Sequence, residues 1–275
     1  MLRGSAGVTT AVSFSRDNSG EAAMPAVTWV TATPFFPCDG ATCYETRMTE
    51  AIDPAPFDLL QWLPEVACAD FHQMARRRGY APGELIYSQG DQGGEMFRVV
   101  EGSVRLSVTR TDGRELLYLL FEPGDCFGVS TLIDGEPLPQ TAEAGRDLEL
   151  QIVTKAAFDE LRQRHRTFDD ALIRLATRHM RLLSGLFADA SLQDMSARVA
   201  SRILSVARSF GRPGDDGIEL SIALSQTELA AMVGGARQTV NKVIMQFRRD
   251  GLLSIRNGRL VIHSTRALKS LASGR

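Results

Sequence analysis

A segment near the C-terminus, residues 225–249, constrains the fold more tightly than any other part of the sequence. It opens with Ser-Gln-Thr-Glu, in which Ser225 can cap a helix and Glu228 can bond back from the third helical position. The Gly-Gly pair at 234–235 interrupts the helical pattern and permits a tight turn. A second helix is predicted from about Arg237 to Arg249. Two short helices joined by a glycine turn indicate a helix-turn-helix.

A hairpin is predicted directly after this motif. Two strand-like runs, LLSI and RLVI, are joined by Arg256-Asn257-Gly258-Arg259, and Asn-Gly is the preferred dipeptide of a two-residue hairpin turn. A helix-turn-helix followed by a hairpin predicts a winged helix. The charge of this region suits a polyanion, because residues 195–275 carry 13 Lys and Arg against 5 Asp and Glu, whereas residues 1–194 carry 18 against 28.

The second helix would present polar side chains suited to a major groove. Arg can donate two hydrogen bonds to guanine and Gln can pair with adenine, while arginines on the hairpin would meet phosphates. The alternative is that these polar residues form a solvated face on a helix pair that binds another protein. The cap, the glycine turn, the residues suited to a groove and the basic hairpin together favour DNA binding. The predicted DNA-binding residues are Ser225, Arg237, Gln238, Thr239, Asn241, Lys242, Arg256 and Arg259.

Residues 57–153 carry a different pattern. Helical spacing broken by Pro64 predicts two short helices before residue 78. Glycines then recur about every eleven residues between short apolar runs, and Asp112-Gly113 suits a hairpin turn. This pattern predicts an antiparallel β-roll of the cupin-like jelly-roll type, so the chain as a whole belongs to the α+β class.

A long helix is predicted after the roll. Thr167 begins Thr-Phe-Asp-Asp, an N-cap motif, and the pattern ends near Ala190. Apolar residues alternate steps of four and three, which is typical of a coiled-coil seam. A helix packed on its own domain would also show an apolar stripe, but the narrow seam favours a dimerisation helix. The predicted seam is Phe168, Leu172, Leu175, His179, Leu182 and Leu186.

Four segments are therefore expected along the chain. Residues 1–50 are either a disordered tail or an upstream extension that precedes a natural start at Met48. Residues 57–153 form an effector-sensing roll with its N-terminal helices. Residues 154–190 form a short helix and the dimerisation helix. Residues 195–275 form the winged helix-turn-helix domain, which includes an amphipathic helix at 195–210 and a Gly/Pro/Asp loop at 211–217.

The sequence argues against several other classes of protein. Four cysteines in 275 residues do not make a disulfide scaffold. There is no apolar run of about 18 residues, as a membrane-spanning helix needs, and no secretory signal, so we expect a cytoplasmic protein. We find no nucleophile elbow, phosphate loop or HExxH motif and therefore expect no enzyme.

The order of roll, long helix and winged helix resembles the Crp/Fnr family of bacterial transcription regulators. The matching stretches are LIYSQGDQGGEMFRVVEGSVRL, LFEPGDCFG, LIDGEP and LSQTELAAMVGGARQTVNKVIMQFRRDGLLSI. The resemblance implies a homodimer, a palindromic operator in double-stranded DNA, RNA polymerase as a partner and an effector at the roll. It places Arg237, Gln238 and Lys242 at base-reading positions and Thr227 near a phosphate contact. Gln238 departs from the family's usual Glu, and Ala236 replaces a capping Ser or Thr.

The effector pocket resembles the family least. Members that bind cyclic nucleotides carry Gly-Glu and a later Arg, whereas here Val129 follows Gly128 and no Lys or Arg occurs between Arg114 and Arg146. Burying a phosphate without a cation is costly, so we expect an effector other than cAMP. The resemblance predicts a pocket lined by Gly128, Val129, Ser130, Thr131, Leu138, Gln140, Thr141, Leu183 and Ser184.

A redox, haem or iron–sulfur sensor is the open alternative. Cys68 and His72 lie at i, i+4 and could share a metal or haem iron, although such a pair is more often a packed helix face. The other cysteines are Cys38, Cys43 and Cys126, and thiol redox chemistry belongs to the same alternative. We predict no cofactor.

Overall fold

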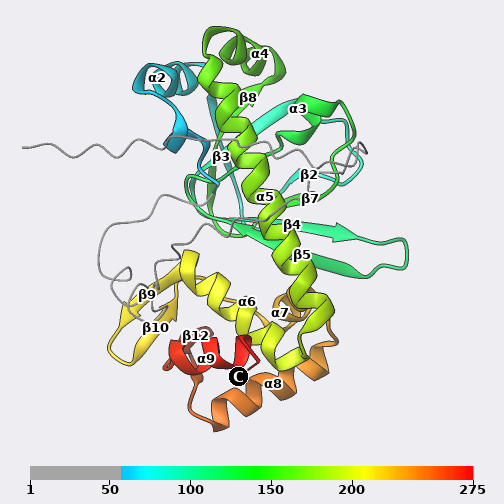
Figure 1. Cartoon of the computed structure of the whole chain (residues 1–275), viewed down its shortest axis with the longest axis vertical. Helices are drawn as coiled ribbons and strands as arrows, with labels where there is room; N and C mark the ends of the chain where they lie inside the picture. Colours follow the sequence, from blue (N-terminus) through cyan, green and yellow to red (C-terminus); the bar gives the residue numbers. More distant parts are fainter. Residues whose placement is uncertain (1–56, 275) are drawn as a thin grey trace, which may run out of the picture. The chain divides into compact units, whose positions relative to one another are not determined.

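The computed structural model describes residues 57–274 (Figure 1), so the segment predicted as a tail or an extension, with Cys38 and Cys43, lies outside the described residues. Two short helices come first, as predicted, and Pro64 separates them. Strands and a short helix follow. The elements are η1 (Leu59–Trp62), α2 (Glu65–Met74), β1 (Arg76–Tyr80), β2 (Leu85–Tyr87), β3 (Glu95–Glu101), β4 (Val104–Thr109), β5 (Glu115–Phe121), β6 (Cys126–Phe127), α3 (Ser130–Asp134), β7 (Thr141–Ala144) and β8 (Leu148–Thr154).

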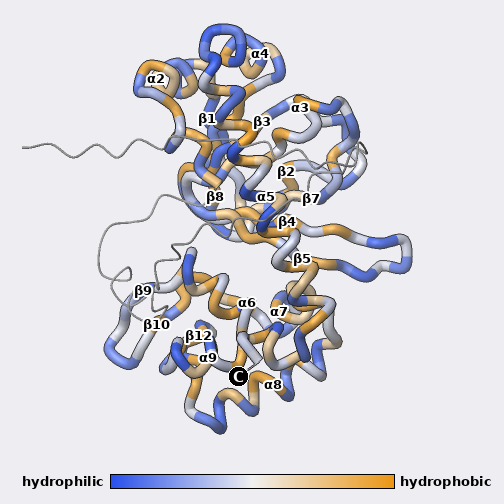
Figure 2. Tube along the Cα trace, in the orientation of Figure 1, coloured by the Kyte–Doolittle hydropathy of each residue, from blue (hydrophilic) through white to orange (hydrophobic). Residues whose placement is uncertain are grey.

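These strands form two four-stranded antiparallel sheets, which confirms the predicted roll. One sheet has the order β1-β8-β3-β6 and the other β2-β7-β4-β5. The predicted hairpin turn joins β4 to β5, whose ladder runs from Val104 opposite Phe121 to Thr109 opposite Glu115. Gly113 adopts a φ of 80° in this turn, which glycine tolerates without strain. Figure 2 shows that the tip of the hairpin is hydrophilic, as a solvent-exposed turn should be.

The interior of the roll is filled by aromatic rings. Tyr87, Phe97, Phe121 and Phe127 are all buried. The ring centroids of Phe97 and Phe127 lie 5.0 Å apart, those of Phe121 and Phe127 5.4 Å apart, and those of Tyr87 and Phe97 5.7 Å apart. These separations lie in the range of attractive aromatic pairs. The two sheets are therefore joined by close ring packing.

A short helix, α4 (Lys155–Arg164), leads into the long helix α5 (Arg166–Leu192). The predicted N-cap at Thr167 is wrong by two residues. His165 occupies the N-cap position without a side-chain cap bond, and its Nε2 lies 2.8 Å from Asp70 Oδ2 on α2. A tertiary contact, rather than a local capping motif, thus fixes where α5 begins.

The face of α5 predicted as a dimer seam packs instead on the roll of the same chain. Phe168, Leu172 and Leu175 are buried in the core of the roll, and the His179 ring stacks on Phe57 with centroids 4.3 Å apart. Leu182 packs partly against the same core, and Leu186 is half-buried. A neighbouring stripe on α5 stays exposed. Its members are Ile173 (64% exposed), Met180 (62%), Leu183 (49%) and Phe187 (75%).

Burial of His179 makes a testable contribution to stability. Desolvation lowers the pKa of His179 to about 4, so the folded state holds a neutral ring where the unfolded state binds a proton below about pH 6.5. The free energy of unfolding should therefore decrease as the pH falls from about 6.5 towards 4. His179→Phe keeps the stack but does not titrate. Between pH 7 and pH 5, we expect the free energy of unfolding of His179→Phe to decrease by roughly 1–2 kcal/mol less than that of wild type, measured by denaturant unfolding.

The comparison between the two proteins at pH 7 and pH 5 isolates this one group. Asp125, whose pKa burial raises to about 8, is present in both and cancels in the difference. Equal losses of stability in wild type and His179→Phe would show that the ring is not held neutral by the fold.

The C-terminal part packs around α6 (Met195–Phe210), whose bounds match the predicted helix. Val199, Ala200 and Ile203 of α6 are buried in a separate apolar core. The segment 211–217, predicted as a loop, is part of a hairpin, and a C-terminal helix was not predicted. The elements are β9 (Gly211–Gly214), β10 (Gly217–Leu220), α7 (Gln226–Val233), α8 (Arg237–Arg249), β11 (Leu253–Arg256), β12 (Arg259–Ile262) and α9 (Thr265–Ala272), with sheet order β11-β12-β10-β9.

Candidate nucleic-acid interface

The helix-turn-helix is fixed by the capping box that the sequence predicts. Ser225 Oγ accepts from the Glu228 backbone N–H at 3.1 Å, and Glu228 Oε2 accepts from the Ser225 N–H at 2.8 Å. Gly234 ends α7 in the left-handed region with a φ of 65°. A Cβ on Gly235 would lie 2.7 Å from the Met195 side chain, so the turn passes close to α6. These contacts set the angle at which α8 leaves the turn.

Helix α8 divides into a buried face and an exposed polar face. Val240, Ile244 and Phe247 are buried against the C-terminal core. The predicted base-reading residues lie on the other side: Arg237, Gln238, Thr239 and Lys242 are exposed, and Asn241 is half-buried. Ala236 occupies the N-cap position without a side-chain hydrogen bond, as expected because alanine has no polar side-chain atom. The first turns of α8 therefore offer donors and acceptors to an outside partner.

The hairpin of β11 and β12 forms the wing, with the predicted turn. Asn257 and Gly258 have φ values of 51° and 75°, and left-handed conformation at both central positions defines a type I′ turn. Arg256 and Arg259 flank this turn and are exposed. Their guanidinium groups are not free in this structure. Arg256 forms an ion pair with Asp216, and Arg259 Nη1 lies 3.6 Å from Glu219 Oε1.

Two other predicted DNA-binding residues lie at the start of α7. Thr227 is exposed, which suits a phosphate contact. The Ser225 hydroxyl is already engaged as the helix cap. Its contribution to an interface is thus to hold α7 in place.

The roll contacts the helix-turn-helix through the β4–β5 hairpin. Leu117 of β5 is buried in the C-terminal core, and Arg105 of β4 forms an ion pair with Glu228, the acid of the capping box. Arg202 of α6 donates to the backbone oxygens of Tyr118 at 3.5 Å and of Met232 at 3.2 Å. The β4–β5 hairpin therefore contacts α7 directly at Glu228, and Arg202 of α6 links the hairpin to the C-terminal end of α7.

Only part of the predicted effector-pocket set is closely packed. Thr131 and Leu138 are buried, and the Thr131 hydroxyl donates to the Gly128 backbone oxygen at 3.3 Å. A Cβ on Gly128 would lie 2.8 Å from the Phe97 ring. Ser184 donates to the Met180 backbone oxygen within its own helix, at 2.9 Å. The remaining predicted lining residues are partly or fully exposed: Val129, Ser130, Gln140, Thr141 and Leu183.

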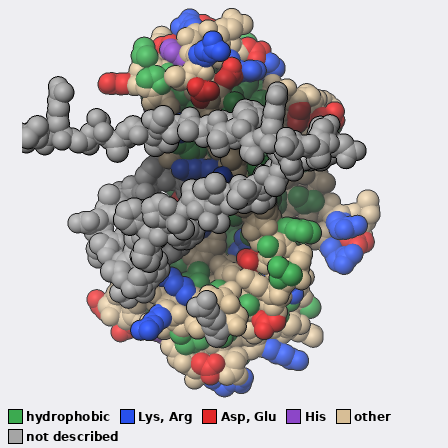
Figure 3. Space-filling view, viewed as in Figure 1, with side chains coloured by type: hydrophobic (Ala, Val, Ile, Leu, Met, Phe, Trp, Pro, Cys, Tyr) green, Lys and Arg blue, Asp and Glu red, His purple; other side chains and the backbone are tan. Residues whose placement is uncertain are grey.

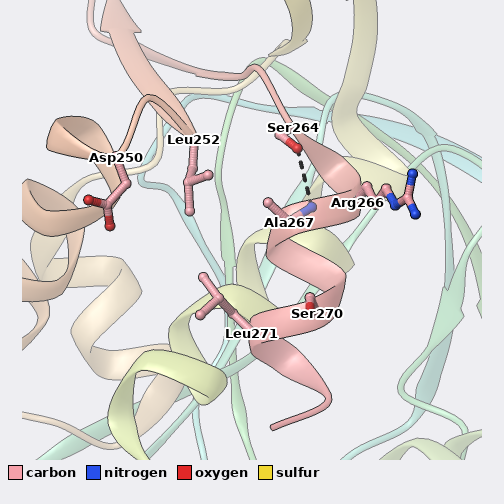
Figure 4. A pocket seen from close by; sticks show the side chains of 7 residues that line it. All are labelled: Asp250, Leu252, Ser264, Arg266, Ala267, Ser270 and Leu271. Carbon is pink, nitrogen blue, oxygen red and sulfur yellow. Dashed lines mark hydrogen bonds between the residues drawn. The ribbon is translucent and has the colours of Figure 1, made fainter. Parts of the chain in front are cut away.

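Two cavities lie away from this set. One of about 390 Å³ is lined in part by Ser103, Arg105, Arg146, Glu228 and Arg259. The other, of about 540 Å³, is lined by seven residues at the C-terminal helix (Figure 4), where Ser264 Oγ accepts from the Ala267 backbone N–H at 3.2 Å. The second cavity contains none of the predicted DNA-binding residues, and we assign it no part in reading bases.

The side chains of Cys68 and His72 each lie against a different hydrogen-bond partner in this structure. Cys68 Sγ lies 3.5 Å from the Leu60 backbone oxygen, and His72 Nδ1 lies 2.9 Å from Gln151 Nε2. Burial raises the pKa of the Cys68 and Cys126 thiols, so both stay protonated at neutral pH and are poor ligands or nucleophiles. Within residues 57–274 no cluster of three or more His, Cys, Asp or Glu is placed to hold a metal ion.

Comparisons with known proteins identify both halves of the chain. Residues 77–165 match the cyclic nucleotide-binding domain family, and residues 197–271 match the Crp-like helix-turn-helix domain. A CRP-like cAMP-activated global transcriptional regulator of Mycobacterium tuberculosis is 28% identical over 68% of this chain and 83% of its own. A global nitrogen regulator of Synechocystis is 26% identical over 67% and 83%. A solved CRP-family transcriptional regulator of Thermus thermophilus is 28% identical with a TM-score of 0.59, and the match covers 71% of this chain and 96% of that one.

The fold and the exposed face of α8 thus define a DNA-binding transcription regulator built from a β-roll and a winged helix. The chain belongs to the Crp/Fnr family. Among the described helices, none has both the length and the apolar character needed to cross a membrane.

Proposed function

We propose that the protein is a cytoplasmic, homodimeric regulator that reads a palindromic operator through α8 and responds to an effector at the roll. The observation that carries the proposal is the exposed polar face of α8, where Arg237, Gln238 and Lys242 stand clear of the core beside a basic wing. RNA polymerase is the proposed protein partner. No enzymatic activity is proposed, and no observation on Cys68 or Cys126 favours a redox or metal sensor.

The exposed stripe of α5 supports the dimer. Ile173, Met180 and Phe187 repeat every seven residues, and Leu183 lies between the last two, so they form a narrow apolar seam. Large apolar side chains that are about half exposed or more along one seam leave a contiguous apolar surface in water unless a partner covers it. A second copy of the same helix would present the same seam about a two-fold axis.

Selection from random duplex DNA tests the proposed function. A two-fold dimer with one reading helix per subunit must place the two helices in successive major grooves. We expect an inverted repeat whose half-site centres lie about 10 bp apart, which is one turn of DNA. Recovery of sequences with no shared motif would contradict sequence-specific reading.

The contacts of the β4–β5 hairpin support a path from the roll to the DNA. Arg105 and Leu117 belong to the roll, and both contact residues of the winged-helix part. A change in the roll that moves this hairpin would also move α7, against which α8 is set. Effector control of DNA binding therefore needs only a displacement of β4 and β5.

We predict that cAMP does not bind to this roll. The rings of Phe97 and Phe127 fill the interior, and no Lys or Arg occurs between Arg114 and Arg146 to neutralise a cyclic phosphate. Isothermal titration calorimetry with cAMP should show no saturable heat at micromolar concentrations. A micromolar isotherm with one site per chain would overturn this prediction.

A further inference from the structure

The acidic residues of the C-terminal domain are concentrated beside the wing. Residues 195–275 contain five acids, and three of them fall in the β9–β10 hairpin: Asp215, Asp216 and Glu219. The other two have local roles, since Glu228 caps α7 and Asp250 accepts from Gln246 Nε2 at 2.7 Å. Figure 3 shows acidic and basic side chains next to one another at this edge of the domain. In a domain with a net charge of +8, this placement calls for an explanation.

Two of these acids contact the arginines of the wing. Asp216 pairs with Arg256, and Glu219 lies 3.6 Å from Arg259. The sheet order explains the contact, because β10 lies directly beside β12. His263 fixes the arrangement: its ring bonds to the Asp216 backbone oxygen at 2.7 Å and to Ser254 Oγ at 2.9 Å. The hairpin tip is thus attached to the wing by backbone as well as side-chain contacts.

We propose that Asp216, with Glu219, occupies the wing arginines in the free protein and so weakens binding to DNA of arbitrary sequence. A carboxylate and a phosphate offer a guanidinium group the same kind of paired oxygen acceptors. DNA phosphates must therefore displace Asp216 before Arg256 can bind them. Close approach of the wing becomes favourable where base contacts by α8 hold the domain on its site. This inference rests on the proposed function, because it assumes that the wing meets DNA.

The geometry favours a readily reversible pair. The Arg256 and Asp216 side chains are 53% and 54% exposed, and an exposed ion pair contributes little net stability. Hydrogen bonds from Arg256 lower the pKa of Asp216, so the carboxylate stays charged across the physiological range. The pair can therefore exchange with phosphate at small cost without unfolding the wing.

Asp216→Asn tests the proposal on a random-sequence 40-bp duplex. We expect the variant to bind about 3- to 10-fold more tightly than wild type at low salt, by fluorescence anisotropy. In the variant, Arg256 would contact a phosphate, and no unpaired carboxylate would remain at position 216 to take up a cation from solution. The slope of log affinity against log salt should therefore steepen by about 0.9.

Asp215→Asn is the matched control, because it removes the same charge one residue away from the pair. If the increase in affinity acts through Arg256, the double variant Asp216→Asn/Arg256→Gln should not show it. Equal gains in the Asp215 and Asp216 variants would overturn the proposal, as would an unchanged Asp216→Asn. These binding measurements test the role of Asp216 alone. The proposed function is tested separately by the selection experiment, where the absence of a shared motif would contradict sequence-specific reading.

Discussion

Met180→Glu should convert the protein to a monomer and weaken binding to the selected operator by roughly 100-fold or more, because binding both half-sites through one dimer gives gains of this size. Met180 lies at the centre of the exposed seam of α5. In a two-fold dimer the substitution would bring two carboxylates together in a dry interface without a cation. The side chain is exposed in the single chain, so the fold should survive. Sedimentation equilibrium measures the first effect and anisotropy on operator DNA the second.

Arg174→Glu provides a strict control on the same helix. Arg174 is exposed on the polar face of α5, and reversing its charge should leave the dimer intact. Leu175→Glu, which the predicted seam would have suggested, is unsuitable, because Leu175 lies in the core of the roll and its replacement would unfold that domain. A Met180→Glu protein that still sediments as a dimer would show that the exposed seam is not the interface.

The shifted seam shows what periodicity can and cannot determine. Phe168, Leu175 and Leu182 repeat every seven residues, and so do Ile173, Met180 and Phe187. Both stripes lie on one amphipathic helix, and period alone does not say which of them meets the roll. The choice depends on which stripe the roll can cover, and that is a property of tertiary packing.

The C-terminal motif was predicted closely because local rules determine it. The capping box at Ser225 and the Asn257-Gly258 turn are specified by residues within a few positions of each other. The placement of α9 depends on a distant partner, because α9 packs on α6, whereas β9 pairs with β10, the next strand along the chain. The β9 sequence, Gly-Arg-Pro-Gly, has no strand-like pattern of its own and is held in the sheet by β10.

The interior of the roll was the least predictable part. The absence of a cation between Arg114 and Arg146 could be seen in the sequence, and it argues against a cyclic phosphate. The sequence could not show how Phe97, Phe121 and Phe127 fill the roll, because ring packing depends on how two sheets approach each other. The wing ion pairs were also missed, since Asp216 and Arg256 are 40 residues apart in the chain.

Arg237→Ala should weaken binding to the selected operator by about 1–3 kcal/mol and relax selectivity at one base pair of each half-site. Arg237 is the first residue of α8 and is exposed, and side chains in the first turn of a reading helix reach base edges. Two guanidinium donors match O6 and N7 of guanine, so we expect guanine at that position. Competition binding with duplexes that differ at single positions measures both effects.

The control for Arg237 lies at the other end of the same helix. Arg249 is exposed and donates to Gln246 Oε1, so Arg249→Ala removes the same charge from α8 without removing a base contact. We expect it to leave the selected motif unchanged. Gln238→Glu should alter the preferred base at one position, since a carboxylate accepts from cytosine N4 where an amide pairs with adenine. A uniform loss of affinity in Arg237→Ala, with the motif intact, would mean that Arg237 contacts the backbone and that the first turn of α8 does not read the sequence.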